Sequence, residues 1–293
     1  MPSSLSSGLV VCGRRFVHSD IAGLRELIAS NPGLSRKELA RRTCQALHWV
    51  APSGQLKEMS SRVALLRLEA KGFIQLPPPQ RSNGNRKPFQ PQHSIEVPAE
   101  NVICSAGALS GLCLQRVVTK ADSRLWNEAI ARFHYLGYKR LPGAQMRYLV
   151  RSTLGLLGAV GFGASAWKAA PRDRWIGWSD SQRQARLHLV ANNARFLLLP
   201  WIRCKNLASL ILAWCARELP RDWQARYGYR PVVLETFVER DRFLGTSYKA
   251  ANWQYVGDTQ GRGKLDRHHQ AALPVKQIYL YPLASDFRQV LCA

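Results

Sequence analysis

The stretch from Gly245 to Gly261, GTSYKAANWQYVGDTQG, mixes aromatic, cationic and turn-forming residues in a way that a hydrophobic core alone does not require. Lys249, Trp253 and Tyr255 lie close together within it. Aromatic rings stack on nucleobases and a lysine ammonium pairs with phosphate, so these side chains are candidate contacts to a nucleic acid. Strand alternation would place Trp253 and Tyr255 on one face, and a shared core face is therefore the competing interpretation.

The segment that follows, DTQGRGKLDRHHQ, is basic and contains two glycines. Arg262, Lys264 and Arg267 make it a candidate phosphate-binding loop, because cations on a pliable backbone can approach a phosphate closely. The adjacent His268 and His269 lack the further spaced ligands that a zinc site requires. We therefore expect phosphate contacts here and no metal.

The whole chain carries a large excess of positive charge: 42 Lys and Arg against 19 Asp and Glu give a formal net charge of +23 over 293 residues. The excess is present in both halves, since residues 1–101 carry 14 − 7 = +7 and residues 102–293 carry 28 − 12 = +16. Clustered cations release condensed counterions when they bind DNA or RNA. The composition indicates a polyanionic partner, with a solvated basic surface as the alternative.

Seven cysteines are present, and none forms a CxxC pair. Their odd number and apolar surroundings predict free thiols in a reducing compartment. The longest apolar stretch, STLGLLGAVGFGASAW, is short and rich in glycine, so we expect a pair of core strands and no membrane span. No secretory signal is evident at the start of the sequence. These features predict a soluble, cytoplasmic protein.

Residues 77–101, PPPQRSNGNRKPFQPQHSIEVPAEN, are dominated by Pro, Asn, Gln and Ser and are unsuited to a packed element. This segment predicts a linker between two domains, residues 1–76 and residues 102–293. The first domain shows three helical patterns followed by FIQL, which can form a strand. Ser35 and Glu38 have the spacing of a capping box at the second helix.

Three short helices and a strand are typical of a winged helix-turn-helix, in which the third helix enters the major groove of DNA. We expect its inward residues to be Leu56, Met59, Val63, Leu66 and Leu68. A small helical bundle used for dimerisation or for a protein partner is the alternative, so a homo-oligomer stays open. The candidate DNA contacts of this domain are Arg36, Lys37, Lys57, Ser60, Ser61, Arg62 and Arg67.

The second domain alternates strand and helix patterns, which predicts a sheet layered with helices. Expected strands include 112–118, MRYLVRS, LLGAVGFGAS, ARFLLLPW, YRPVVLETFVE, WQYVGDT and VKQIYLYPL. Expected helices are DSRLWNEAIARF, SDSQRQARLHLVANN capped by Ser179, NLASLILAWCAREL ended by Pro220, and GTSYKAAN. The candidate DNA contacts of this domain are Arg203, Lys205, Lys249, Trp253, Arg262, Lys264 and Arg267.

This order of elements resembles the GCN5-related N-acetyltransferase fold, in which a strand leads through a phosphate-binding loop into a helix, as FLLLPWIRCKNLASLILAW would. A second strand, a short helix and a final hairpin follow. The expected fold class is therefore α+β or α/β: an N-terminal winged helix-turn-helix, then an acetyltransferase-like mixed sheet with flanking helices. The resemblance places the coenzyme A loop at Arg203, Asn206 and Ala208. Asn206 stands where the family pattern has glycine, so we expect no coenzyme A.

The same resemblance implies roles for two further side chains. Glu235 would lie on a strand facing the cleft and act as a general base, and Tyr248, which matches the superfamily's tyrosine, would act as a general acid. The competing interpretation is a structural Glu235 bonded to neighbouring backbone.

Across nearly the whole chain, runs such as FHYLGYKRLPGAQMRYLV and VLETFVERDRFLGTSYKAANWQYVGDTQGRGK resemble the DruA family of the Druantia anti-phage systems. Relatives of this domain also occur beside insertion-sequence transposases. The resemblance implies a bacterial protein that acts on DNA, in phage defence or with a mobile element. In defence it implies a helicase-type partner.

Three functions are consistent with these patterns. The first, which we favour, is a DNA-binding protein without a cofactor. The second is a coenzyme A-dependent acyltransferase. The third is a Mg²⁺-dependent nuclease or nickase, which would need carboxylates converging on the ions. Its candidate carboxylates are Asp180, Glu235, Asp258 and Asp266.

Overall fold

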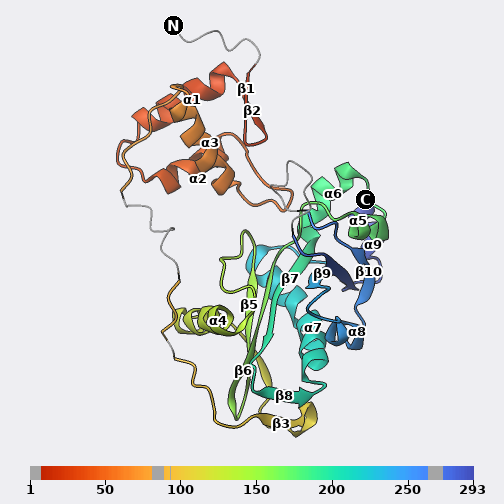
Figure 1. Cartoon of the computed structure of the whole chain (residues 1–293). Helices are drawn as coiled ribbons and strands as arrows, with labels where there is room; N and C mark the ends of the chain where they lie inside the picture. Colours follow the sequence, from red (N-terminus) through yellow and green to blue (C-terminus); the bar gives the residue numbers. More distant parts are fainter. Residues whose placement is uncertain (1–7, 81–88, 93, 263–272) are drawn as a thin grey trace. The chain divides into compact units, whose positions relative to one another are not determined.

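The computed structural model describes residues 8–80, 89–92, 94–262 and 273–293 (Figure 1). The chain divides into two compact units, Met1–Lys87 and Pro88–Ala293. This division falls inside the segment 77–101 that the sequence indicates as a linker.

The first unit is built on a short antiparallel hairpin and three helices (Figure 1). The Ser35 hydroxyl accepts a hydrogen bond from the backbone N–H of Glu38 at 3.2 Å, which confirms Ser35 as the N-cap of the second helix. Buried apolar side chains from all three helices and the hairpin form one core, including Phe16, Leu24 and Leu39. The elements are β1 (Leu9–Val11), β2 (Arg14–Phe16), α1 (His18–Ala29), α2 (Arg36–Ala46) and α3 (Glu58–Ala70).

The buried face of α3 differs from the one expected from sequence. Ser61, Ala64 and Leu68 are buried, together with Leu65, while the expected inward residues Met59, Val63 and Leu66 are exposed. Both stripes have the same helical period, and the small Ala64 lets the helix pack closely on its buried side. The prediction for Leu68 is confirmed; those for Met59, Val63 and Leu66 were wrong.

The strand expected at FIQL does not form within the part of the chain that the structure describes. Ile74 and Leu76 are buried against the same core, and the backbone N–H of Leu76 donates to a Glu69 carboxylate oxygen at 2.9 Å. The Leu76 N–H thus bonds to a side chain, whereas in a sheet it would bond to the backbone carbonyl of a neighbouring strand. The described residues after α3 therefore do not form the strand of a wing.

The second unit is a mixed sheet of seven strands in the order β10-β11-β9-β7-β6-β5-β4, with a separate two-stranded ladder of β3 and β8. All neighbours in the large sheet are antiparallel except β7 and β9. The elements are β3 (Val102–Ser105), η2 (Ala106–Ala108), β4 (Cys113–Arg116), α4 (Lys120–Phe133), β5 (Met146–Ser152), β6 (Gly155–Ala164), α5 (Ala170–Ile176), α6 (Asp180–Arg186), η3 (Leu187–Leu189), β7 (Val190–Leu198), β8 (Ile202–Lys205), α7 (Leu207–Tyr227), β9 (Val233–Glu239), α8 (Thr246–Ala250), β10 (Gln254–Asp258), β11 (Lys276–Pro282) and α9 (Phe287–Cys292).

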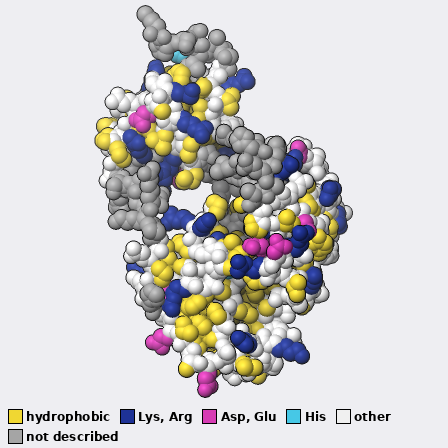
Figure 2. Space-filling model, viewed as in Figure 1, with side chains coloured by type: hydrophobic (Ala, Val, Ile, Leu, Met, Phe, Trp, Pro, Cys, Tyr) yellow, Lys and Arg dark blue, Asp and Glu magenta, His cyan; other side chains and the backbone are white. Residues whose placement is uncertain are grey.

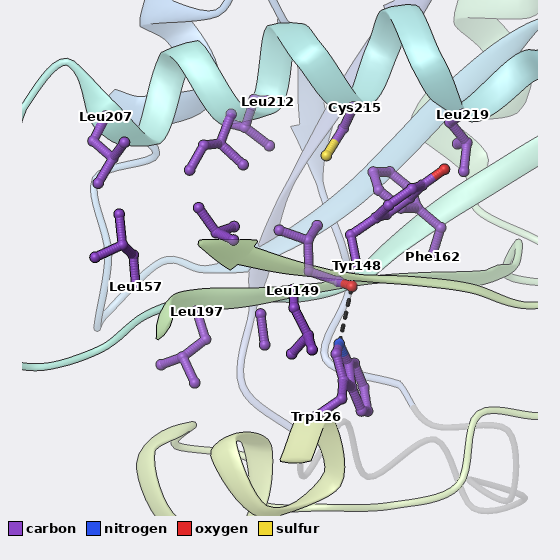
Figure 3. Packing of buried hydrophobic residues seen from close by; sticks show 14 of the residues in the cluster. Trp126, Tyr148, Leu149, Leu157, Phe162, Leu197, Leu207, Leu212, Cys215 and Leu219 are labelled. Carbon is purple, nitrogen blue, oxygen red and sulfur yellow. Dashed lines mark hydrogen bonds between the residues drawn. The ribbon is translucent and has the colours of Figure 1, made fainter. Parts of the chain in front are cut away.

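Helices cover both faces of the sheet, as Figure 3 shows for α4 on one side and α7 on the other. From α7, Leu212 and Cys215 point to the strands. From α4, the Trp126 ring lies against β6, and its indole N–H donates to the Val160 carbonyl at 3.0 Å. A Cβ at Gly161 would stand 2.7 Å from this ring, so the close approach of α4 requires glycine there.

Two boundaries of the second unit differ from expectation. The helix capped by Ser179 ends at Arg186, and β7 already begins at Val190. Helix α7 passes through Pro220 and continues to Tyr227. A proline forfeits one helical hydrogen bond and crowds the preceding turn. Pro220 is buried, so packing offsets that cost.

The end of the expected linker belongs to the second unit. The Glu128 carboxylate of α4 accepts hydrogen bonds from the Ser94 hydroxyl at 2.7 Å and from the Ile95 backbone N–H at 3.1 Å. Arg132 donates to both the Ile95 carbonyl and the same carboxylate. These bonds attach residues 94–95 to α4. No helix in the described parts of the chain is long and apolar enough to cross a membrane.

Candidate functional site

The two parallel strands at the centre of the sheet part soon after they begin. β7 and β9 pair only from Val190–Asn192 to Val233–Glu235. Beyond these three pairs, β7 continues along β6 and β9 continues along β11. The divergence leaves a cavity of about 480 Å³, which we call the aromatic cavity. It is lined by residues 133–136, 193–194, 196–198, 236–238 and 243–248.

Tyr248 lies in the wall of the aromatic cavity and is held by a small network of hydrogen bonds. Its hydroxyl donates to the Asn193 side-chain oxygen at 2.7 Å and accepts from the Thr236 hydroxyl at 3.3 Å. Burial raises the pKa of the Tyr248 phenol far above its usual value. The side chain is therefore a fixed neutral phenol whose proton points to Asn193.

Glu235 is fully buried, and both of its carboxylate oxygens are occupied. One accepts from the Ala166 backbone N–H at 2.7 Å, and the other accepts from the Arg172 guanidinium at 2.8 Å. Among the described residues, Glu235 does not line the aromatic cavity where Tyr248 lies. This geometry favours the structural interpretation and does not bring together the pair of groups that acid–base catalysis needs.

Arg172 is the centre of a buried charged cluster, which we call the Arg172 cluster. Besides Glu235, its guanidinium contacts the Asp173 carboxylate at 2.8 Å and 2.9 Å. Asp173 also accepts from the Trp178 indole N–H at 3.0 Å and lies 3.7 Å from the Arg183 guanidinium. Sequence reasoning missed Arg172, since 63 residues separate it from Glu235.

The expected coenzyme A loop is not a loop. Arg203 and Lys205 lie in β8, which pairs in parallel with β3, and α7 begins directly afterwards. Asn206 does adopt the positive φ that replaces glycine, at 65°, and Ala208 lies in the first turn of α7. Arg203 and Lys205 are exposed. Strand pairing engages Ile202–Lys205, whereas Asn206 and the first turn of α7 lie outside the ladder.

The other candidate contacts of the second unit differ in how exposed they are to solvent. Lys249 is exposed at the end of α8, whereas Trp253 is 3% exposed and packs edge-on against the Tyr248 ring. The prediction that Trp253 stacks on a nucleotide was wrong, because it precedes β10 and turns into the core. Tyr255 is 51% exposed, but its ring lies 5.8 Å from Tyr279, as that of Trp253 lies 5.8 Å from Tyr281, so the two rings share one face of the sheet as expected. Arg262 is exposed; Lys264 and Arg267 lie outside the described residues.

In the first unit, Lys37, Arg62 and Arg67 are exposed and Lys57 is half-buried at the start of α3. Arg36 is half-buried and donates to the Pro77 carbonyl at 2.7 Å. Ser61 is wholly buried beside Cys44, so the prediction that it contacts DNA was wrong; it lies on the core-facing side of α3.

The candidate nuclease carboxylates do not gather. Asp180 pairs with Lys168 and Arg183, Asp258 pairs with Arg240, and Glu235 belongs to the Arg172 cluster. Within the described ranges, no group of three His, Cys, Asp or Glu side chains is placed to hold a metal ion. Asp266 lies outside these ranges.

Sequence reasoning also missed Arg195, His134 and Tyr135. His134 and Tyr135 line the aromatic cavity, and Arg195 lies beside them on β7. The signal for Arg195 is an arginine that interrupts a strongly apolar strand, ARFLLLP. The turn FHYLG gives no comparable signal, because its aromatic residues fit a core equally well.

The strand order defines the class of the second unit: an α+β protein whose central mixed sheet follows the acetyltransferase-like order, strand, helix, parallel strand, short helix and hairpin. The model of the family described as Druantia protein DruA matches residues 67–272, which are 206 of the 293 residues. The chain therefore belongs to the DruA family.

Solved structures with a similar arrangement are acetyltransferases and related acyl-transfer enzymes. An N-acetyltransferase from Staphylococcus aureus Mu50 has 14% identity and a TM-score of 0.37, over 60% of this chain and 100% of that one. FeeM, an N-acyl amino acid synthase from uncultured soil microbes, has 11% identity and a TM-score of 0.35, over 64% and 97%. A GNAT-family acetyltransferase from Bacillus cereus has 10% identity and a TM-score of 0.28, over 46% and 69%.

All three TM-scores lie below 0.5, so the class of the second unit is assigned from its strand order and not from these superpositions. A comparison with curated protein sequences gave no match.

Proposed function

We propose that this protein binds DNA and serves a bacterial anti-phage defence system or a mobile element. Membership of the DruA family supports the defence setting. In that setting we propose a helicase-type partner, which co-purification with the neighbouring defence proteins tests.

The observation that carries the proposal is the net charge of +23, distributed over both units. On the face shown in Figure 2, Lys and Arg side chains are spread over both units, while Asp and Glu are sparse. A surface of this kind attracts a polyanion and releases its counterions on binding. The charge exceeds what solubility alone asks of a domain of this size.

In this proposal, α3 is the helix that enters the major groove. Its exposed side carries Arg62 and Arg67 beside Met59, Val63 and Leu66. Arginine hydrogen-bonds guanine edges, and apolar side chains contact the thymine methyl group. The orientation of α3 leaves both kinds of side chain open to solvent, which supports the proposal. We assign the phosphate contact to the exposed Lys37 at the start of α2.

The test is a paired substitution on α3. We expect Lys57→Ala with Arg62→Ala to weaken duplex DNA binding at least tenfold, measured by fluorescence anisotropy at two salt concentrations. The matched control is Lys139→Ala with Arg140→Ala, which removes the same charge from two exposed residues of the second unit. Equal losses of DNA affinity in the two double variants would show that DNA responds to the overall positive charge and not to α3. Unchanged affinity in the α3 variant would remove this helix from the interface.

A further inference from the structure

A second cavity of about 720 Å³ adjoins the aromatic cavity. Leu136, Asn193, Ala194 and Phe237 line both, so the two cavities meet where β7 and β9 part. Five of the six charged side chains among the described residues that line this second cavity are cations, and we call it the basic cavity. They are Lys168, Arg174, Arg195, Arg262 and Lys276.

The described residues offer these cations few counter-charges. Asp258 is the carboxylate among the described lining residues, and it is already engaged by Arg240 at 3.3 Å and by the Tyr255 hydroxyl at 3.0 Å. Lys168 lies 3.8 Å from Asp180, in a pair whose members are both largely exposed. Such a pair contributes little.

Arg195 is the cation whose surroundings are least complete. It is half-buried, its Nη1 donates to the Ala194 carbonyl at 2.6 Å, and its buried Nε has no partner within the described ranges. The nearby Asn192 side-chain oxygen is also buried and has no partner among the residues that the structure describes. A buried donor and a buried acceptor left unpaired each cost free energy. Both atoms are closed to solvent, so a ligand reaches them only if the surrounding side chains shift. The accessible part of the half-buried Arg195 guanidinium lines the basic cavity and can meet a phosphate oxygen directly.

The mouth of the aromatic cavity carries exposed rings. Tyr135 and Phe243 are 37% and 45% exposed, and their ring centroids are 5.2 Å apart in an edge-on arrangement. His134 stacks on Tyr135 with ring centroids 4.9 Å apart, and the Arg242 guanidinium lies over the Tyr135 ring, 4.9 Å from its centroid. Water-exposed aromatic rings beside a basic cavity are the combination that binds unpaired bases.

We propose that the two cavities together bind one unstacked nucleotide of single-stranded DNA, with the base in the aromatic cavity and its phosphate at Arg195. This deepens the proposed function and rests on it, because it names the form of DNA that the second unit takes. Both volumes fall within the roughly 300–1,000 Å³ of ordinary ligand sites. Duplex DNA cannot present a base in this way without unpairing it.

The charge balance explains why a nucleotide fits better than a neutral ligand. Burial and the charge of Arg195 lower the pKa of His134 to about 4, so His134 is neutral near pH 7 and adds no cation to the aromatic cavity. The base therefore meets neutral rings, and the phosphate meets unpaired cations. The neutral aromatic cavity thus matches the uncharged base, and the basic cavity matches the negatively charged phosphate.

The experiment uses the full chain and a twelve-residue oligothymidylate carrying one 2-aminopurine, with a duplex of equal length in parallel. We expect Arg195→Gln and Phe243→Ala each to weaken single-strand binding at least tenfold and duplex binding less than twofold. 2-Aminopurine fluorescence should be quenched by the wild type and not by Phe243→Ala. The salt dependence of single-strand binding should fall by about 0.7 in slope for Arg195→Gln, which is one phosphate contact.

The matched controls are Arg140→Gln, an exposed arginine outside both cavities, and Trp167→Ala, a 62% exposed ring that lines neither. The inference would be overturned if Arg195→Gln and Phe243→Ala both bound single-stranded DNA with wild-type affinity. It would also be overturned if they lost affinity for single-stranded and duplex DNA to the same extent. Arg195→Lys, which keeps the charge, guards against a folding defect: partial recovery is expected. A wild type that binds neither DNA would refute the proposed function itself, whereas duplex binding without quenching would refute this inference alone.

Discussion

Arg172 and Arg195 belong to the same half of the second unit but are neutralised in opposite ways. Arg172 is fully buried and meets two carboxylates, Glu235 and Asp173, at 2.8 Å. Arg195 is half-buried and is hydrogen-bonded to a backbone carbonyl, with no carboxylate beside it among the described residues. A buried charge that serves the fold is paired, since an uncompensated one is strongly destabilising. An arginine left unpaired beside a cavity instead points to a ligand that supplies the anion.

The largest effect expected from this comparison is on stability. Glu235→Gln should lower the free energy of unfolding by about 3–5 kcal/mol, because it leaves the buried Arg172 short of a counter-charge. Urea unfolding at pH 7 measures it. Asp180→Asn is the control: Asp180 pairs with Arg183 of the same cluster but is 68% exposed, and its loss should cost about 1 kcal/mol at most. Equal effects of the two substitutions would contradict the comparison.

The next effect is a pH dependence at His134. An unfolded histidine takes up a proton near pH 6.5, but the folded His134 does so only near pH 4. The contribution of His134 to stability should therefore be constant above pH 6.5 and fall as the pH drops from 6.5 towards 4, by about 2 kcal/mol at pH 5. The measurement is urea unfolding of the wild type and His134→Gln at pH 7 and pH 5. The variant should lose less stability than the wild type between pH 7 and pH 5. Identical losses would mean that His134 is solvated and that its pKa is not lowered.

A smaller effect on stability is expected at Arg195. Arg195→Gln should change the free energy of unfolding by about 1 kcal/mol or less, because Arg195 has no ion pair with the described residues. Thermal unfolding beside Arg172→Gln provides the direct contrast. If Arg195→Gln destabilised the protein as much as Arg172→Gln, the arginine would be a structural residue and the comparison would fail.

The smallest effect concerns Ser61 in the first unit. Its hydroxyl is buried and lacks a conventional hydrogen-bond partner within the described ranges, so Ser61→Ala should change stability by about 0.5 kcal/mol or less. DNA binding should stay at the wild-type level, unlike that of the α3 double variant. Anisotropy and urea unfolding on one preparation report both. Weakened DNA binding at wild-type stability would show that α3 turns its other side to DNA.

Local patterns predicted much of the secondary structure of both units. MRYLVRS coincides with β5, and the caps Ser35 and Ser179 begin helices as expected. These features depend on neighbouring residues, which is the information that a short stretch of sequence contains. The order of strands and helices followed from these patterns, and the resemblance to a known fold followed from that order.

Other features could not be predicted because they depend on distant partners. The face of α3 was wrong because Met59, Val63 and Leu66 have the same spacing as the stripe that is buried. Proline usually ends a helix, but α7 continues through Pro220 because this residue is buried in the core. The pairing of Arg172 with Glu235 and the gap between β7 and β9 are properties of the assembled sheet, so the basic cavity was also beyond local reasoning.

The β3–β8 ladder has a consequence for how the chain is made. Cys104 and Cys204 face each other across it, with their sulfur atoms 2.6 Å apart, although 100 residues separate them in the sequence. At 5–20 residues per second, a ribosome needs roughly 5–20 s to make the intervening chain. During that time β3 has no partner strand, and its open edge is exposed to other nascent chains.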